Sequence, residues 1–267
     1  MRVVHNLQAS AKRIGRRILD ERILGVADYY IYPERRNSWG GPFNGQPFRQ
    51  ELFLAMIDVV KPTVIIETGT YLGTTTDFMA ATDLPVFTIE GHARNYGFAR
   101  ARLWRRRNVK LFLGDSRQVL RSLFAGPLRN ILNCSLFFYL DAHWNADLPL
   151  GAELDIIYTC CASAVVMIDD FQVPDEAGYG YDDYGSGKAL TFDYIRRVLE
   201  RYQLTIYYPS IPAIKEGGRR RGCAVLVRDL QQNDAMDSLK TLRRAEWLQE
   251  TSLETKQSPE SRHENSE

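Results

Sequence analysis

Two short segments of this chain place acidic side chains directly after apolar residues. FYLDAHW carries Asp141 and His143, and MIDDF carries Asp169 and Asp170. If both segments are neighbouring parallel strands, about 4.8 Å apart, these carboxylates converge on one point. Three acids that close repel one another unless a cation or protons lie between them. Because an all-oxygen cluster suits a hard ion such as Mg²⁺, we predict Asp141, Asp169 and Asp170 as metal ligands.

His143 has more than one interpretation. Its near-neutral pKa suits the removal of a hydroxyl proton by a general base, and Asp141 would share in that catalytic role as a metal ligand two residues away. His143 could also bind the metal directly, or simply be a packed polar residue beside Trp144. The sequence leaves these alternatives open.

A second group of candidates begins in VIIETGTYLGTTT, residues 64–76. Glu67, Gly69 and Gly73 form E-x-G-x-x-x-G, which differs from the G-x-G-x-x-G of dinucleotide-binding turns. A carboxylate at this turn disfavours a pyrophosphate and favours a cationic ligand, and S-adenosylmethionine carries a sulfonium and an ammonium group. The alternative is that the glycines serve only the turn.

The next two apolar segments end in groups that fit the same ligand. Glu90 ends the second, where an acid can accept hydrogen bonds from both ribose hydroxyls. The third is followed by Asp115 and Ser116, which are placed to meet the edge of an adenine ring. Three consecutive segments therefore each supply a suitable group.

The elements that position these residues alternate along the chain. Short apolar segments rich in β-formers are predicted strands, and helical patterns separate them. This alternation is typical of βαβ crossovers and a parallel, doubly wound α/β sheet. Two further strands with no helix between them, joined by GGRRRG, are predicted to pair antiparallel at one sheet edge. The predicted strands are 63–67, 86–90, 109–113, 136–141, 164–169, 204–208 and 223–227, and the predicted helices are 74–82, 92–106, 115–124, 150–161 and 188–202.

Residues 60–228 resemble the class I S-adenosylmethionine-dependent methyltransferases through ETGTYLG, FTIEGH, LGDS, FYLDAHW and MIDDF. The resemblance implies a three-layer αβα, Rossmann-like fold with seven strands in the order 3-2-1-4-5-7-6, the last one antiparallel. It also implies S-adenosylmethionine as cofactor. The cofactor contacts that follow are Glu67, Gly69, Tyr71, Gly73, Glu90, Asp115, Ser116 and Asp141.

The acid-rich segments are similar to those of metal-dependent O-methyltransferases of the macrocin type. In this resemblance, Asp141, Asp169 and Asp170 match the metal-binding acids of that family. LDAHW departs from the acid-Gly-acid pattern usual in that family. The resemblance implies Mg²⁺-dependent methylation of a small-molecule hydroxyl on a sugar, polyketide or phenolic compound. Three other functions stay open: a nicotinamide-dependent oxidoreductase, a metal-dependent hydroxylase or deacetylase-like enzyme using Asp141, His143 and Asp169, and a binding module without catalysis.

Two loops are predicted to line the acceptor pocket. Residues 37–50, NSWGGPFNGQPFRQ, resemble a lid over the cofactor, with Gln46 and Arg49 as candidate contacts. Residues 174–188, PDEAGYGYDDYGSGK, mix glycines with Tyr179, Tyr181 and Tyr184, as substrate-binding loops do. A solvent-exposed connector is the alternative for this second loop.

Composition limits the remaining possibilities. The 267 residues carry a formal net charge of +1, which argues against a general nucleic-acid binder. No apolar segment approaches the roughly 20 residues needed to span a bilayer, so we expect a cytoplasmic protein. Cys134, Cys160, Cys161 and Cys223 show no CxxC spacing and are predicted to be reduced core residues. A homo-oligomer is compatible with the sequence.

The expected organisation has three parts. Residues 1–59 form a helical and lid segment, residues 60–230 the methyltransferase domain, and residues 231–267 a helix followed by a disordered tail. Residues 1–19 contain basic but no acidic residues, which favours a packed amphipathic helix, with organelle targeting or membrane-surface binding as alternatives. The basic LWRRR at 103–107 is expected to be a solvated helix end.

Overall fold

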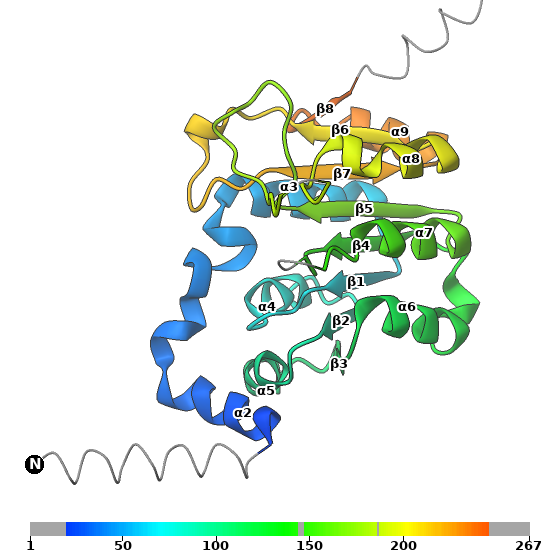
Figure 1. Cartoon of the computed structure of the whole chain (residues 1–267). Helices are drawn as coiled ribbons and strands as arrows, with labels where there is room; N and C mark the ends of the chain where they lie inside the picture. Colours follow the sequence, from blue (N-terminus) through cyan, green and yellow to red (C-terminus); the bar gives the residue numbers. More distant parts are fainter. Residues whose placement is uncertain (1–19, 144–146, 186, 246–267) are drawn as a thin grey trace, which may run out of the picture.

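A single eight-stranded sheet forms the centre of the protein (Figure 1). The computed structural model describes residues 20–143, 147–185 and 187–245. The strand order is β3-β2-β1-β4-β5-β7-β6-β8. The strands are β1 (Val64–Thr68), β2 (Val86–Glu90), β3 (Val109–Leu113), β4 (Leu136–Leu140), β5 (Ala164–Asp169), β6 (Thr205–Pro209), β7 (Cys223–Val227) and β8 (Leu242–Arg244).

The pairing of the strands confirms the predicted topology. β1 pairs in parallel with β2 and β4, β2 with β3, and β4 with β5, while β7 is antiparallel to both β5 and β6. The prediction of seven strands missed β8, which pairs antiparallel with β6. β8 has only three residues, LRR, which is too short to show an alternating pattern.

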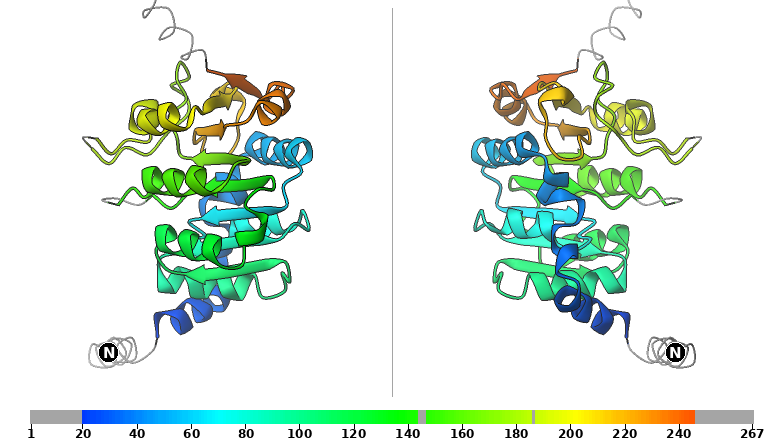
Figure 2. Two further views of the ribbon diagram at one scale, coloured as in Figure 1. Left: turned by 90° about the vertical axis from the view of Figure 1, so that its right-hand side faces the viewer. Right: turned by 90° about the vertical axis from the view of Figure 1, so that its left-hand side faces the viewer.

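Helices cover both faces of the sheet, as Figure 2 shows. On one face, α6 (Ser116–Ala125), α7 (Leu150–Cys160) and α8 (Phe192–Tyr202) enclose the larger part of the core. On the other, α3 (Pro47–Val60), α4 (Thr74–Ala80) and α9 (Leu230–Asp237) pack over the same strands. β1, β4 and β5 are therefore buried along their whole length, which explains their continuous apolar sequences.

The chain before β1 crosses the edge at which the parallel strands end (Figure 1). α2 (Glu21–Ile31) packs on α5 (Ala93–Arg102), where Asp28 forms ion pairs with Arg35 and Arg94. The short 3-10 helices η1 (Pro33–Gly40) and η2 (Pro42–Gly45) then lead to α3. We call residues 33–46 the strap. Phe43 of the strap is buried in the core, so this segment is part of the fold.

Some expectations fall outside the described residues or fail. Segments 1–19 and 246–267, with their predicted helix and tail, lie outside the described residues. Cys161 and Cys223 are buried as predicted, but Cys160 is exposed and Cys134 partly exposed, so the core prediction was wrong for these two. Within the described ranges, no helix combines the length and apolar character required to cross a bilayer.

Candidate functional site

The turn after β1 is built around the buried carboxyl group of Glu67. Its Oε2 accepts hydrogen bonds from the hydroxyl groups of Thr76 on α4 and Thr88 on β2. Its Oε1 is also buried, and no group of the described residues hydrogen-bonds to it. Burial raises the pKa of Glu67 to about 7, although the two threonine hydroxyls lower it in part. One oxygen of this acid thus keeps its capacity to accept a hydrogen bond.

Gly69 and Gly73 have left-handed backbone conformations that other residues rarely adopt. Gly69 has φ +86°, and a Cβ there would lie 2.0 Å from the carbonyl oxygen of Asp141. Gly73 has φ +75°, and a Cβ would lie 3.3 Å from that of Ala99 on α5. The packing of the turn against β4 and α5 is thus sufficient to explain both glycines. Their predicted contact with a cofactor stays a prediction.

Glu90 links the turns that follow β1 and β2. Its Oε2 accepts the backbone amide of Tyr71 at 2.6 Å, and its Oε1 accepts that of His92 at 2.7 Å. Burial raises the pKa of Glu90, and these two amides oppose that shift. Each carboxylate oxygen has a second lone pair, so Glu90 can still accept hydrogen bonds from a ligand. Tyr71 is partly exposed beside it.

Asp115 and Ser116 begin α6. Asp115 is the N-cap and accepts the amide of Arg117 at 2.9 Å, and hydrogen bonds from the Arg117 side chain lower its pKa. Ser116 is buried beside Glu153 of α7, a buried acid that the sequence analysis did not identify. The hydroxyls of Ser116 and Thr68 lie next to the Glu153 carboxyl without forming well-aligned hydrogen bonds. Burial raises the pKa of Glu153 to about 7.

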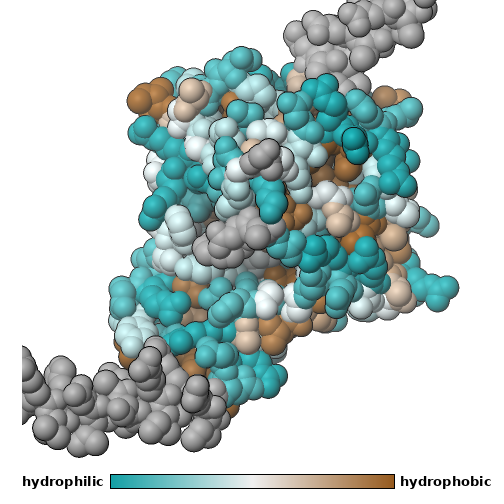
Figure 3. All heavy atoms as spheres, viewed as in Figure 1, coloured by the Kyte–Doolittle hydropathy of each residue, from teal (hydrophilic) through white to brown (hydrophobic). Residues whose placement is uncertain are grey.

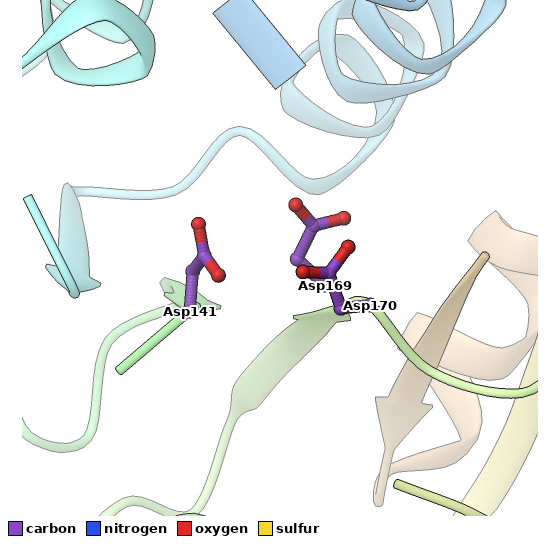
Figure 4. A group of neighbouring side chains, drawn as sticks. All are labelled: Asp141, Asp169 and Asp170. Atoms are coloured by element: carbon purple, nitrogen blue, oxygen red, sulfur yellow. The ribbon is translucent and has the colours of Figure 1, made fainter. Parts of the chain in front are cut away.

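The predicted acid cluster is present at the ends of β4 and β5 (Figure 4). β4 and β5 pair in parallel, with Leu140 opposite Ile168, so the next residues, Asp141 and Asp169, are neighbours at the end of the two strands. Asp170 has φ +52°, a left-handed conformation that interrupts the alternation of side chains along a strand. Asp141, Asp169 and Asp170 each offer a ligand oxygen, and these atoms lie within 4.8 Å of one another.

Asp169 is the most constrained acid of the cluster. Arg49 on α3 forms a buried ion pair with its Oδ1. Its Oδ2 accepts the hydroxyl of Tyr139 at 2.6 Å and the side-chain amide of Asn44 at 3.1 Å. The strap and α3 therefore hold this carboxylate in place. Gln46 donates to the Arg221 carbonyl, and Arg49 contacts both Asp169 and that carbonyl. Their predicted place over the cofactor stays a prediction.

A second arginine pairs with Asp170. Arg221, which precedes β7, donates from Nε to Asp170 Oδ1 at 2.6 Å, and its Nη2 pairs with Asp182. Asp182 lies in the 174–188 loop, so one segment of the predicted acceptor loop does lie beside the cluster. Within the described residues no ion pair reaches Asp141.

The electrostatics of the cluster reflect burial and like charge. Burial and the neighbouring Asp169 raise the pKa of Asp170 to about 7, against the effect of Arg221. The same two causes raise the pKa of Asp141 well above its ordinary value. If Asp141, Asp169, Asp170 and Asp182 are all ionised, four negative charges face the two positive charges of Arg49 and Arg221. The difference is two charges, which a divalent cation would neutralise.

His143 is buried next to the cluster. Its Nε2 lies 3.2 Å from the backbone carbonyl of Asp169, which can only accept a hydrogen bond. Nε2 therefore carries the proton, and Nδ1 carries the lone pair. Nδ1 has no hydrogen-bond partner among the described residues. Burial lowers the pKa of His143, so the neutral ring dominates at pH 7.

Several residues of the site were not identified from the sequence. Tyr139 could have been recognised, because it lies two residues before Asp141 and so shares a face of the extended chain with it. Arg221 is in the GGRRRG loop, which was identified only as a connector. Asn44 and Asp182 lie in the loops 37–50 and 174–188 that were predicted to line the acceptor pocket, but neither was singled out, because neither follows a strand.

Comparisons with solved structures agree with this architecture. An O-methyltransferase from Bacillus cereus, solved in complex with S-adenosylhomocysteine, matches with a TM-score of 0.50 and 16% identity, over 68% of this chain and 81% of that one. The O-methyltransferase TomG from Streptomyces achromogenes, involved in tomaymycin synthesis and solved with S-adenosylmethionine, has a TM-score of 0.48 and 17% identity, over 67% and 79%.

The structural match to the Bacillus cereus protein supports the fold and nothing beyond it. The chain has the fold of the class I S-adenosylmethionine-dependent methyltransferases, which confirms the fold that the motifs predicted. No family model matches the sequence. No curated protein matches it either.

Proposed function

We propose that this protein is an S-adenosylmethionine-dependent O-methyltransferase that uses a divalent cation, Mg²⁺, to methylate a small-molecule hydroxyl group. The observation that carries the proposal is the convergence of Asp141, Asp169 and Asp170 at the strand ends. This acid cluster lies at the same edge of the sheet as Glu67 and the turn that follows β1, because β1 and β4 are adjacent and parallel.

The residues after β1 and β2 fit S-adenosylmethionine. Glu67 and Glu90 retain acceptor capacity in a buried setting, which suits the cationic and hydroxyl groups of this molecule. Tyr71 and the Gly69 and Gly73 turn would lie beside it, and Asp115 and Ser116 would meet the adenine. When bound, S-adenosylmethionine supplies an electrophilic methyl group.

The acid cluster fits Mg²⁺. Its donor set is all oxygen, its ligand atoms lie close together, and its net charge is matched by a divalent ion. Asp141 has no cationic partner in the described residues, and Asp170 keeps lone pairs beyond the one that Arg221 uses. Asp169 keeps one on Oδ1 beside the contact with Arg49, because Oδ2 already accepts two hydrogen bonds. When bound, Mg²⁺ would lower the pKa of a hydroxyl group that reaches it.

His143 is the residue that we propose as the general base. The hydrogen bond from its Nε2 to the Asp169 carbonyl fixes the ring and leaves the lone pair on Nδ1. A neutral histidine can take the proton of an acceptor hydroxyl at physiological pH. Asp182 and Asp169 would then stabilise the resulting positive charge, since both favour the protonated ring. The strand ends would bring the methyl donor and the acceptor together, and such positioning supplies much of the rate enhancement in enzymes.

The first experiment is direct and needs no acceptor. Native mass spectrometry of the purified protein, followed by calorimetric titration with S-adenosylmethionine, should show one bound equivalent. A matched titration with NADH should show none, because E-x-G-x-x-x-G fits a dinucleotide poorly. Binding of NADH without S-adenosylmethionine would replace the proposal with an oxidoreductase.

A further inference from the structure

Arg221 joins three segments of the chain that are far apart in the sequence. It is the last arginine of the loop at 217–222, and it contacts the residue after β5, the segment 179–184 and the junction between the strap and α3. Its side chain is 24% exposed, and those of Asp170 and Asp182 are 18% and 20% exposed. These ion pairs are therefore shielded from water more than surface pairs are.

The Arg221 guanidinium bridges two acids. Nε donates to Asp170 Oδ1 at 2.6 Å, while Nη2 pairs with Asp182. Asp170 is a proposed metal ligand, and Asp182 belongs to the segment 179–184. A single side chain thus ties the acid cluster to that segment.

Segment 179–184 is also fixed through its backbone. The amide of Asp182 donates to the Asp170 carbonyl at 2.9 Å, and that of Gly180 donates to the Arg220 carbonyl at 2.9 Å. Tyr184 donates to Asp182 and lies 3.4 Å from the carbonyl oxygen of His143. The segment therefore forms a wall beside both the acid cluster and His143.

The backbone of Arg221 is held independently of its side chain. The side-chain amide of Gln46 donates to the Arg221 carbonyl at 3.0 Å and accepts the Arg221 amide at 3.0 Å. A substitution that removes the guanidinium should consequently leave the loop backbone in place. Side-chain and backbone contributions can therefore be separated by mutation.

We propose that Arg221 is a positioning residue that holds segment 179–184 against the acid cluster, so that this segment forms the acceptor side of the active site. The assignment of that wall to the acceptor rests on the proposed methyltransferase function. The mechanical role of Arg221 does not, because it follows from the contacts of the free protein.

Amide hydrogen exchange tests this role without any ligand. In Arg221→Gln, the amides of residues 180–184 should exchange roughly tenfold faster, while those of α6 and α7 stay unchanged. Asp182→Asn should give the same local increase, and the double variant should be no faster than either single one, because both substitutions remove the Arg221–Asp182 ion pair, through which Arg221 reaches this segment. Arg221→Lys, which can satisfy only one of the two acids well, should be intermediate.

Arg219→Gln is the matched control, since Arg219 lies in the same loop but its guanidinium stacks on Trp39, 4.5 Å from the ring centroid. It should exchange as the wild-type protein does at residues 180–184. Wild-type exchange in Arg221→Gln, or additive increases in the double variant, would overturn the proposal. If Arg221→Gln does not fold, the comparison of Arg221→Lys with Asp182→Asn decides in the same way.

Failure of this proposal can be distinguished from failure of the proposed methyltransferase function. Titration of the same variants with Mn²⁺ and S-adenosylmethionine should leave S-adenosylmethionine affinity at the wild-type value. Wild-type protein that binds neither would contradict the methyltransferase proposal and would leave the exchange data as the measure of Arg221.

Discussion

Glu90 links the turns after β1 and β2, where we propose that the cofactor binds. It holds two turns together and keeps lone pairs for ribose hydroxyls. Glu90→Ala should weaken S-adenosylmethionine binding by about 1.5–3 kcal/mol, because charge-assisted hydrogen bonds are lost. Calorimetry measures this, with the exposed Glu51→Ala on α3 as control. Unchanged affinity in Glu90→Ala would remove Glu90 from the cofactor site.

His143 is tested by turnover rather than by binding. His143→Gln should retain S-adenosylmethionine and Mn²⁺ binding, while methyl transfer falls by roughly 10²–10⁴-fold, the usual contribution of a general base. His92→Gln, which changes an exposed histidine at the start of α5, is the control. If His143→Gln instead loses Mn²⁺, the imidazole is a metal ligand and another group must act as base.

The residues that were predicted from sequence share one property. Glu67, Glu90, Asp141 and Asp169 lie at or directly after strand ends, and parallel strands bring such positions to one edge. The residues that pair with them come from distant parts of the chain. Arg49 is 120 positions from Asp169, and nothing local in the sequence reports that contact.

At the scale of elements, the turn between β1 and α4 depends on close backbone packing against β4. Gly69→Ala should destabilise the protein by at least about 2 kcal/mol, because the added Cβ meets the Asp141 carbonyl and the left-handed conformation is strained. Urea unfolding measures the effect. Gly151→Ala in α7 is the control, since nothing lies within 4 Å of that Cβ position. It should be neutral or slightly stabilising.

Equal stabilities of the two variants would show that the turn adjusts without cost. That outcome would weaken the assignment of Gly69 to packing and return it to the cofactor site.

Glu153 makes the packing of α7 on α6 dependent on pH. Its pKa is about 7 in the folded protein and 4.5 as its reference value, so the folded state binds more protons between these values. The stability due to protonated Glu153 is fully present below pH 4.5 and is lost as the pH rises towards 7. Glu153→Gln keeps the neutral form at every pH. It should therefore be more stable than wild type at pH 8, by up to about 3 kcal/mol.

Urea unfolding from pH 4.5 to pH 8 tests this sign. The stability difference between Glu153→Gln and wild type should increase with pH, apart from a constant offset due to the amide. A difference that does not change with pH would show that Glu153 does not titrate in this range.

The elements themselves were largely predictable. The seven longer strands and five of the helices show clear patterns, because buried parallel strands are continuously apolar and the helices between them are amphipathic. The strap gave no such pattern. Its path depends on left-handed conformations at Trp39 and Phe43, which these residue types do not favour, and on tertiary contacts such as that between Asn44 and Asp169.

At the scale of the whole molecule, the fold concentrates charge that the composition hides. The chain is nearly neutral, with a formal net charge of +1, and most of the face in Figure 3 is hydrophilic with small apolar patches between. Yet four acids and two arginines gather at one edge of the sheet. The strand order brings Asp141, Asp169 and Asp170 together, and α3 and two loops add the other three residues. We therefore expect this edge to be a divalent-metal site that serves methyl transfer.

The most direct test measures transfer of a labelled methyl group from S-adenosylmethionine to sugar, polyketide and phenolic hydroxyl acceptors. We predict transfer in the presence of Mg²⁺, its loss in excess EDTA, and its return when Mg²⁺ is restored, because the ionised acids need a cation to bind the acceptor oxygen. Transfer that continues at the full rate in excess EDTA would contradict the claim and would leave His143 alone to activate the acceptor.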